Sequence, residues 1–439
     1  KYFCPTITSE QLMIQKSPDN NVPGLNSWWY RTPAERFWEG LPLGTGRLAA
    51  MVYGRVQHEV IPFNDETLWT GQPYDPVRPG GPERLKEVRR LLRKGEFRQA
   101  LNASRGLFSN PLQVQMYQPM GRLCVDFDGH DDPADYRREL DMDRAVAKVT
   151  YRIGDDLFTR EVFASYPDQV IVVRLACNHP GRISFTTRLD SIQASAESRT
   201  ADNNELVMTG GTAQRDIESK MRWEARLRVI PEGVKVIPGA ADNDNPRTAA
   251  CLTVKNADTA TIVLSGATNF VDWNDISADP AARCTQYMVA AEKPYASLLE
   301  RHIRDYQPLF RACTLSLDSA EGHSEGSAVT NTTARLDAMR KQGCDDPLFV
   351  AQYFQYGRYL LLADSRPGTL AFNNHNVWLD NLQGRWNGRW TLNINLQECY
   401  WCAENTNLPE TNDALLLFVK QLAESGARTA RDLYSCGGW

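Results

Sequence analysis

The chain has 439 residues, enough for two or three domains that each bury a core. Hydrophobic residues make up 42% and charged residues 23%, proportions that are ordinary for a globular protein and exclude a disordered one. The net charge of −5 offers no basic surface to nucleic acid or anionic membrane, and no apolar run reaches the length of a membrane span.

The first 280 residues are predicted to be mostly strands. Short apolar runs between Trp28 and Gly71 are broken by glycines and a proline, as in sheets with tight turns. Pro82 opens a helix that ends near Gly95, and a shorter helix follows over 97–101. Alternating strand patterns return at residues 147–153, 157–163, 170–175, 183–189, 223–230 and 261–264. We therefore expect two packed antiparallel sheets within residues 1–280.

The rest of the chain is predicted to be helical. Residues 281–345 are expected to form a helical linker that ends in a loop rich in Ser, Gly and Thr. Within the last region, residues 346–439, a helix over 348–363 is apolar on most sides, as expected for a buried inner helix. A second helix, over 413–433, is amphipathic. The residues predicted for its buried face are Leu416, Val419, Leu422 and Ala423.

The ten cysteines follow no recognisable pattern. Cys399 and Cys402 have the C-x-x-C spacing of a metal site, but no second pair and no His lies near them in the sequence. We therefore expect free thiols for most of them, no metal and no cofactor.

The stretch from Trp390 to Leu408 gathers the polar and aromatic side chains that a sugar pocket needs. Thr391, Asn393 and Asn395 are polar at alternate positions, and alternate residues of an extended segment share one face. Two aromatic residues follow, and flat rings suit the apolar faces of sugars. From spacing alone, a half-buried strand that turns its polar residues to water is the simpler interpretation.

Motifs elsewhere in the chain resemble those of one family. They are Trp38–Arg47, Asn64–Gly71, Ala267–Phe270, His302–Tyr306, Phe354–Leu361, Ser365–Leu370 and Asn381–Gly384, followed by Asn-x-Asn and by Tyr400-Trp401. Together they resemble glycoside hydrolase family 95, the inverting α-L-fucosidases and α-L-galactosidases. No single motif is decisive, but the ordered set spans nearly the whole chain.

The resemblance implies both a fold and a mechanism. The fold is α+β and multidomain: an antiparallel β-sandwich, a helical linker and an (α/α)6 catalytic barrel, of which residues 346–439 have room for only the first part. In the family, two asparagines hold the attacking water, and here these are Asn393 and Asn395. Trp390, Thr391 and Trp401 are expected to bind substrate beside them. The Asp that polarises the asparagines and the Glu that acts as general acid are expected beyond the last residue.

Thr391 departs from the family pattern, because family fucosidases usually have a His two residues before the first asparagine. L-Fucose is L-galactose without the C6 hydroxyl, and the smaller Thr leaves room for CH2OH and offers it a hydroxyl partner. We therefore expect an inverting exo-glycosidase that acts on terminal α-L-galactosyl residues of oligo- or polysaccharides, in the periplasm or outside the cell. The alternatives are an α-1,2-L-fucosidase, a disaccharide phosphorylase and a carbohydrate-binding protein without catalysis.

Two further features are given structural roles. Asp65 and Glu66 lie in one of the family motifs of the predicted sandwich, and we interpret them as bracing the domain interface. Residues 371–379 form an insertion relative to the family pattern. They are expected to shape the rim of the pocket.

Overall fold

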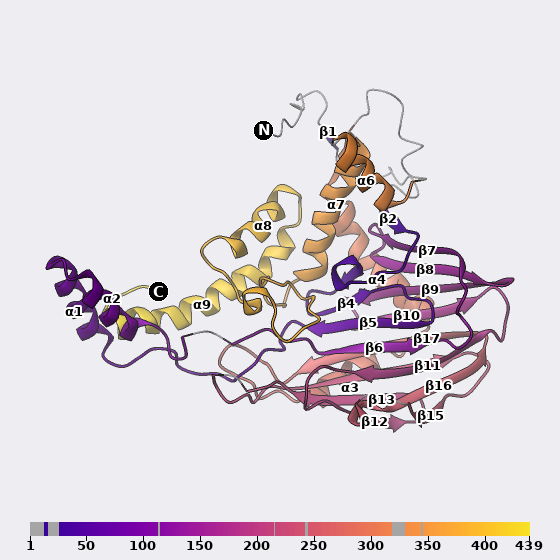
Figure 1. The fold of residues 1–439 in the computed structure, drawn as a ribbon, viewed down its shortest axis with the longest axis horizontal. Coiled ribbons are helices and arrows are strands. Elements are labelled where there is room, and N and C mark those ends of the chain that lie inside the picture. Colours follow the sequence, from indigo (N-terminus) through magenta and orange to yellow (C-terminus); the bar gives the residue numbers. More distant parts are fainter. Residues whose placement is uncertain are drawn as a thin grey trace.

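The computed structural model describes residues 13–15, 26–112, 115–214, 216–241, 245–317, 330–343 and 346–439. These residues form two large sheets with a group of helices at one side (Figure 1). The sheets have nine and seven strands, and every strand pair in them is antiparallel. A third, two-stranded sheet pairs β1 (Met13–Gln15) with β18 (Thr314–Ser316).

The nine-stranded sheet is built around strands that are buried on both faces. Val170, Ile171, Val172 and Val173 are all buried, because helices cover the outer face of the sheet while the second sheet covers the inner one. A two-residue turn starting at Gly154, with φ of 58°, closes a hairpin in this sheet. In spatial order the strands are β12 (Glu197–Asp202), β13 (Glu205–Gly211), β14 (Arg222–Pro231), β17 (Thr259–Thr268), β10 (Val170–Cys177), β9 (Asp156–Ser165), β8 (Val146–Ile153), β7 (Ala134–Asp141) and β2 (Ser27–Tyr30).

The seven-stranded sheet packs its inner face on the first. Its strand β11 alternates buried and half-buried residues along its whole length, and Ile183, Phe185 and Leu189 point into the core. In spatial order the strands are β15 (Ile237–Ala240), β16 (Ala250–Ala257), β11 (Ile183–Asp190), β6 (Gly121–Asp126), β5 (His58–Asp65), β4 (Leu48–Val52) and β3 (Leu41–Gly44).

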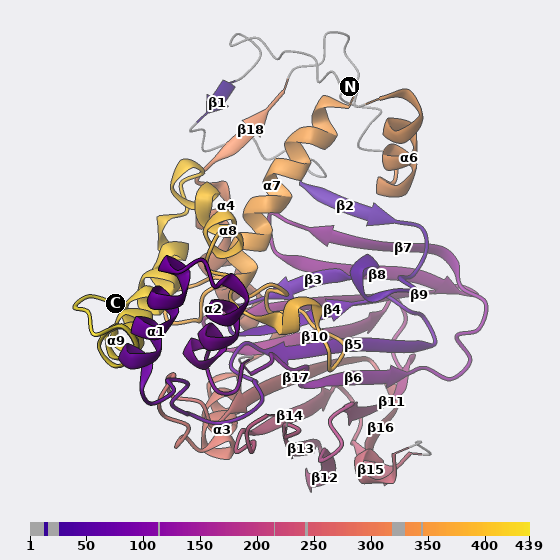
Figure 2. The same ribbon diagram turned by 60° about the vertical axis from the view of Figure 1, so that its left-hand side comes forward.

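Some of the described helices begin at a side-chain cap. Asp279 accepts a hydrogen bond from the backbone N–H of Ala281, and Asp346 accepts one from that of Phe349. Figure 1 shows the hairpin of the first two helices against the end of the last helix, away from the sheets, and Figure 2 shows the same hairpin from another side. The α-helices are α1 (Gly81–Arg93), α2 (Phe97–Ser104), α3 (Pro280–Ala290), α4 (Tyr295–Arg311), α6 (Thr332–Gln342), α7 (Pro347–Asp364), α8 (Asn395–Asn405) and α9 (Asn412–Tyr434). The 3-10 turns within the described residues are η1 (Phe37–Glu39), η2 (Arg105–Leu107), η3 (Pro246–Thr248), η4 (Arg385–Gly388) and η5 (Pro409–Thr411).

The helical region shares one hydrophobic core with the sandwich. Tyr359 of α7 is fully buried, and its hydroxyl donates to the backbone carbonyl of Pro42 in β3. Trp28 of β2 packs against Tyr356 of α7, with ring centroids 4.1 Å apart. The same core continues through α8, where Leu396 is buried. The junction between sheets and helices is therefore a packed interface and not a loose contact.

The predicted α+β fold is confirmed in so far as antiparallel sheets are followed by a helical C-terminal region. The predicted buried face of α9 is partly wrong, because Leu416 is 63% exposed and Val419 is also exposed in the described part of the chain. Helical periodicity identifies an apolar stripe but not the element that covers it. The completion of a barrel and the division at residues 280 and 345 stay predictions.

Candidate functional site

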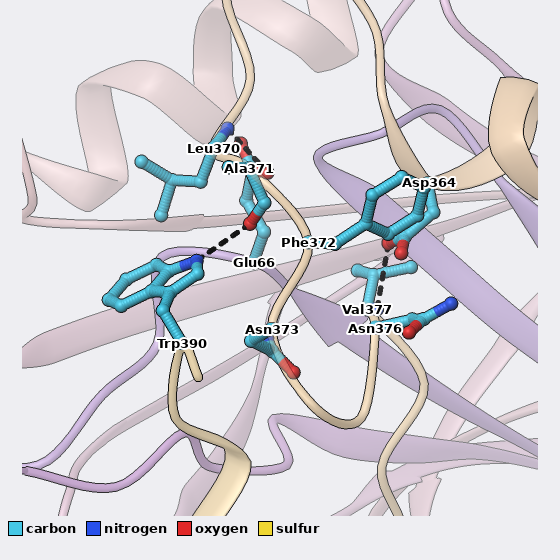
Figure 3. Close-up of a pocket in the computed structure, with 9 residues that line it drawn as sticks. All are labelled: Glu66, Asp364, Leu370, Ala371, Phe372, Asn373, Asn376, Val377 and Trp390. Carbon is cyan, nitrogen blue, oxygen red and sulfur yellow. Dashed lines mark hydrogen bonds between the residues drawn. The ribbon is translucent and has the colours of Figure 1, made fainter. Parts of the chain in front are cut away.

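A small cavity lies where the sandwich meets the helical region. It has a volume of about 10 Å³, which is room for one water-sized oxygen. The end of β5, the end of α7 and the loop that follows α7 meet around it (Figure 3). The lining residues are Glu66, Asp364, Leu370, Ala371, Phe372, Asn373, Asn376, Val377 and Trp390.

The loop after α7 is tied down through its backbone N–H groups. Glu66 Oε2 accepts a hydrogen bond of 2.8 Å from Leu370 N, so a sandwich residue holds the helical region. Asp364 Oδ1 accepts one of 2.8 Å from Val377 N. The interface bracing predicted for Glu66 is confirmed. The loop of residues 370–377 is therefore held at both ends by buried carboxyl groups.

Asp65, the other residue interpreted as a brace, has its partners inside the sandwich. Its carboxylate pairs with Arg47 and accepts hydrogen bonds from the backbone and hydroxyl of Thr67. Arg47 also donates to the backbone carbonyl of Gly266. The pair therefore stiffens the end of β5, immediately before Glu66.

The two buried carboxyl groups at the cavity favour their neutral forms. Burial raises the pKa of Asp364 well above its usual value. Burial also raises the pKa of Glu66 well above its usual value, and the neighbouring charge of Asp65 adds to the effect. Among the described residues, no Lys, Arg or His forms an ion pair with either group. Perturbed carboxyl groups of this kind are characteristic of functional sites.

Trp390 forms one wall of the cavity and is held on three sides. Its ring stacks on Trp69, with centroids 4.4 Å apart and planes at 17°, and it packs at 5.1 Å against Phe418. Its indole N–H donates to the carbonyl of Ala371 at 2.9 Å (Figure 3). Since one ring face is already stacked on Trp69, any sugar contact would be made by the remaining face or edge.

Thr391 is engaged by a residue that the sequence did not single out. Asn374 Nδ2 donates a 2.6 Å hydrogen bond to Thr391 Oγ1, and Asn374 N donates to the carbonyl of Arg389 at 3.0 Å. Asn374 belongs to the inserted loop, whose expected place at the rim of the site is consistent with these contacts. Its role could not be read from spacing, because the two partners are seventeen positions apart in the sequence.

The extended conformation predicted for Thr391 to Asn395 is wrong. The segment makes a turn, and α8 begins at Asn395. Leu396, Tyr400 and Ala403 are buried at helical spacing, so burial of this stripe fixes the local period at 3.6 residues rather than 2. The polar side chains consequently do not share one strand face.

The predicted catalytic asparagines lie at the start of α8. Asn393 and Asn395 are both exposed, and neither borders the cavity. Trp401 is 64% exposed on the same helix, whereas its neighbour Tyr400 is buried and bonded to Ser365. The roles assigned to Asn393, Asn395 and Trp401 stay predictions.

Trp386 is another exposed tryptophan, and it lies in a turn with an unusual backbone conformation. Trp386, Asn387 and Gly388 are consecutive residues in the left-handed region, with φ of 54°, 59° and 62°. Trp386 is 79% exposed. The turn is held to the sandwich because Tyr117 N donates to the carbonyl of Asn387. Sequence reasoning missed this feature, because Gly and, less strongly, Asn favour such a backbone, whereas Trp does not.

The described residues contain no candidate metal-binding group and no candidate membrane-spanning helix. No group of three or more His, Cys, Asp or Glu side chains in this part of the chain is arranged to hold a metal ion. None of the helices described is both long and apolar enough to cross a membrane. Cys399 and Cys402 are free thiols.

Comparisons with known proteins define the class and then the family. Residues 28–273 match the glycosyl hydrolase family 65 N-terminal domain, and residues 294–439 match the glycosyl hydrolase family 95 catalytic domain. A sandwich followed by a glycosidase catalytic domain is the class of protein that the fold and these matches define. The chain belongs to glycoside hydrolase family 95.

Named relatives agree with this assignment. "Alpha-L-fucosidase 2" of Arabidopsis thaliana is 33% identical over 425 residues, which cover 93% of this chain and 50% of that protein. "Probable alpha-fucosidase A" of Aspergillus niger is 30% identical over 414 residues, which cover 91% of this chain and 50% of that protein. The chain therefore spans about half the length of the curated relatives it matches.

A solved structure shares the fold. The "putative kojibiose phosphorylase from human microbiome" is similar with a TM-score of 0.51 at 10% sequence identity. The similarity covers 98% of this chain and 52% of that one. At this identity the likeness concerns the fold alone.

Proposed function

We propose that the protein is an inverting exo-glycosidase for terminal α-L-sugars, and that its preferred substrate carries a terminal α-L-galactosyl residue. Family membership and relatives named α-fucosidases support the broader activity. The narrower choice rests on one observation, the hydrogen bond from Asn374 to Thr391. A periplasmic or extracellular location is proposed from this substrate class.

The direction of that hydrogen bond determines what Thr391 offers a ligand. Asn374 Nδ2 can only donate, so Thr391 Oγ1 is the acceptor and its own proton must point elsewhere. A sugar hydroxyl at C6 is a suitable acceptor for that proton. L-Fucose has a methyl group there and would leave the hydroxyl of Thr391 without a partner. Sites that hydrogen-bond a substrate hydroxyl reject the analogue without it strongly.

The test compares kcat/KM for matched aryl α-L-galactoside and α-L-fucoside in the complete protein. We expect the wild type to prefer the galactoside. Thr391→Val removes the hydroxyl at nearly constant volume and should lower the preference by about tenfold or more, since a lost buried hydrogen bond costs about 1–3 kcal/mol. Thr391→His should move it further towards the fucoside.

Thr391→Ser keeps the hydroxyl and serves as the matched control, which should retain the preference. A wild type that prefers the fucoside would refute the galactosyl proposal and leave an α-L-fucosidase. Proton NMR of the first product tests the stereochemistry, because inversion of an α-L-glycoside releases the β anomer.

Phosphorolysis is the alternative reaction to be tested. Phosphorolysis transfers the glycosyl group to phosphate, whereas hydrolysis transfers it to water. Product analysis with and without inorganic phosphate separates the two. A sugar phosphate formed only with phosphate present would overturn the proposed hydrolysis.

A further inference from the structure

Asp364 ends α7 with a carboxyl oxygen that has no partner. The residue is 4% exposed, and its Oδ1 accepts the hydrogen bond from Val377 N. Its Oδ2 is buried and makes no hydrogen bond to any residue that the structure describes. A buried polar atom without a partner is unfavourable, so native structures rarely leave one. Asp364 also borders the cavity, which leaves space for a partner beside it.

The surroundings of Asp364 disfavour a negative charge. Burial raises its pKa, and its place at the C-terminal end of an 18-residue helix adds the negative end of the helix dipole. The opposite side of the cavity carries another buried carboxyl, that of Glu66. The titratable or charged groups that interact with these two carboxyls are Asp65, Arg47 and Tyr117 from the sandwich and Cys399 and Tyr400 from α8.

The one cation in that set is already engaged. Arg47 is bonded to Asp65 and to the backbone of the sandwich. It therefore compensates its own partner and leaves Asp364 without a counter-charge among the described residues. A protonated carboxyl needs no counter-charge and gains an O–H donor.

We propose that the cavity binds one neutral hydroxyl-type oxygen, and that Asp364 is a protonated acid that donates a hydrogen bond to it from Oδ2. The volume of about 10 Å³ fits one oxygen and excludes a whole sugar ring. Glu66, Asn373 and Asn376 supply further polar groups on the cavity wall. The ligand is a water molecule in the free protein, or a single hydroxyl of a sugar seated outside the cavity.

The bound oxygen would complete a neutral bridge at the domain interface. Glu66 and Asp364 each hold one backbone N–H of the same loop, and that loop carries Asn374, which bonds Thr391. The proposal therefore makes Asp364 a positioning residue for the loop beside Thr391. It rests on the cavity and its polar groups, so it stands or falls independently of the sugar that the protein prefers.

Infrared difference spectroscopy tests the protonation state directly. At neutral pH we expect the carbonyl stretching band of protonated carboxylic acids in the wild type, and the difference spectrum against Asp364→Asn should contain the part of that band that Asp364 contributes. The matched control is Asp65→Asn, which removes a buried carboxylate that is paired with Arg47 and should leave the contribution of Asp364 to the band unchanged. A wild type with no such band at neutral pH would overturn the proposal, and this measurement does not depend on any variant folding.

A high-resolution crystal structure of the wild type tests the ligand. An ordered oxygen within hydrogen-bond distance of Asp364 Oδ2 supports the proposal, and an empty cavity or a metal ion refutes it. Soaking with L-galactose or L-fucose separates the two sources of the oxygen. A water that persists identifies a structural water, and its replacement by a sugar hydroxyl identifies a contact with substrate.

The pH dependence of stability gives an independent check. A carboxyl whose pKa is raised in the folded state binds its proton more tightly there, so the wild type loses stability as pH rises above the unfolded value of about 3.9. Asp364→Asn has no proton to lose. The Tm of the variant relative to the wild type should therefore increase between pH 5 and pH 8. A difference that stays constant over this range would contradict the proposal.

Discussion

At the scale of single residues, Arg358 shows how one side chain can satisfy the last carbonyl groups of a helix. It is fully buried in α7, yet its guanidinium donates to the carbonyls of Leu309, Phe310 and Cys313 at the end of α4. Its Nε donates to the carbonyl of Thr406 after α8. The last carbonyls of a helix lack intrahelical donors, and a planar guanidinium can reach several of them together. One residue thus joins three helices.

The catalytic roles predicted for Asn393 and Asn395 can be tested with single substitutions. In the complete protein, Asn393→Ala and Asn395→Ala should each lower kcat by about 10²–10⁴, the usual contribution of acid–base assistance. Both residues are exposed, so the variants should keep the wild-type Tm. The measurement is kcat on an aryl glycoside, with Gln397→Ala, another exposed residue of α8, as the control. Turnover near that of the wild type in both variants would remove the proposed role.

The site could be predicted from the sequence only in part. Glu66 was found because its motif indicated an interface, and the structure shows its carboxyl holding Leu370. Asp364 and Asn374 were missed, because their partners come from a loop whose path no local pattern encodes. One signal was present for Asp364: an acidic residue closes a long apolar helix, where the helix dipole opposes its charge.

At the scale of elements, the junction between β3 and α7 depends on a residue without a side chain. Gly44 lies directly against the backbone of Ala363, so a Cβ at Gly44 would collide with the carbonyl oxygen of Ala363. Neither backbone can retreat, since β3 is paired in its sheet and α7 is packed on the core. The contact lies close to Asp364.

Two glycine substitutions make a matched pair for this junction. Gly44→Ala should destabilise the protein by about 1–3 kcal/mol, the range found for overpacked sites. Gly357→Ala, on the exposed side of α7 with open space around it, should stabilise by about 0.5–1 kcal/mol, since Ala is the better helix former. Urea unfolding of both variants measures the difference. Equal effects of the two substitutions on the free energy of unfolding would show that β3 and α7 can move apart at this junction without loss of stability.

Elements with a strong periodic pattern were predicted well, and the exceptions have physical causes. The helix opened by Pro82 and the strands from β8 to β11 lie where their spacing indicated. The segment before Asn395 was predicted as extended, because alternating polar residues satisfy a period of two over such a short length. The segment from Asn395 is helical because a helix buries both Leu396 and Tyr400. Their burial depends on the tertiary structure, which a local sequence pattern does not contain.

At the scale of the whole molecule, the shared core predicts cooperative unfolding. The same cluster contains Trp223 of β14, Tyr359 of α7 and Leu396 of α8. Because the helices and the sheets bury each other's apolar surface, neither should melt alone. We expect thermal unfolding curves from near-ultraviolet and far-ultraviolet circular dichroism to coincide. Loss of the helical signal at a lower temperature than that of the aromatic signal would contradict this.

The contact between α1 and α9 has a consequence for the order of folding. Gly81, at the start of α1, is packed so closely on Leu433, near the end of α9, that no side chain would fit between them. During synthesis the segments of the two sheets and of α1 and α2 leave the ribosome before α9, so the surface that α9 contacts is already present in the chain when α9 emerges. A chain diluted from denaturant must instead bring α1 and α9 together across the long segment between them, while other contacts compete. Contacts between segments that are far apart in the sequence form slowly. We therefore expect folding during synthesis to reach the native state faster than refolding from denaturant does.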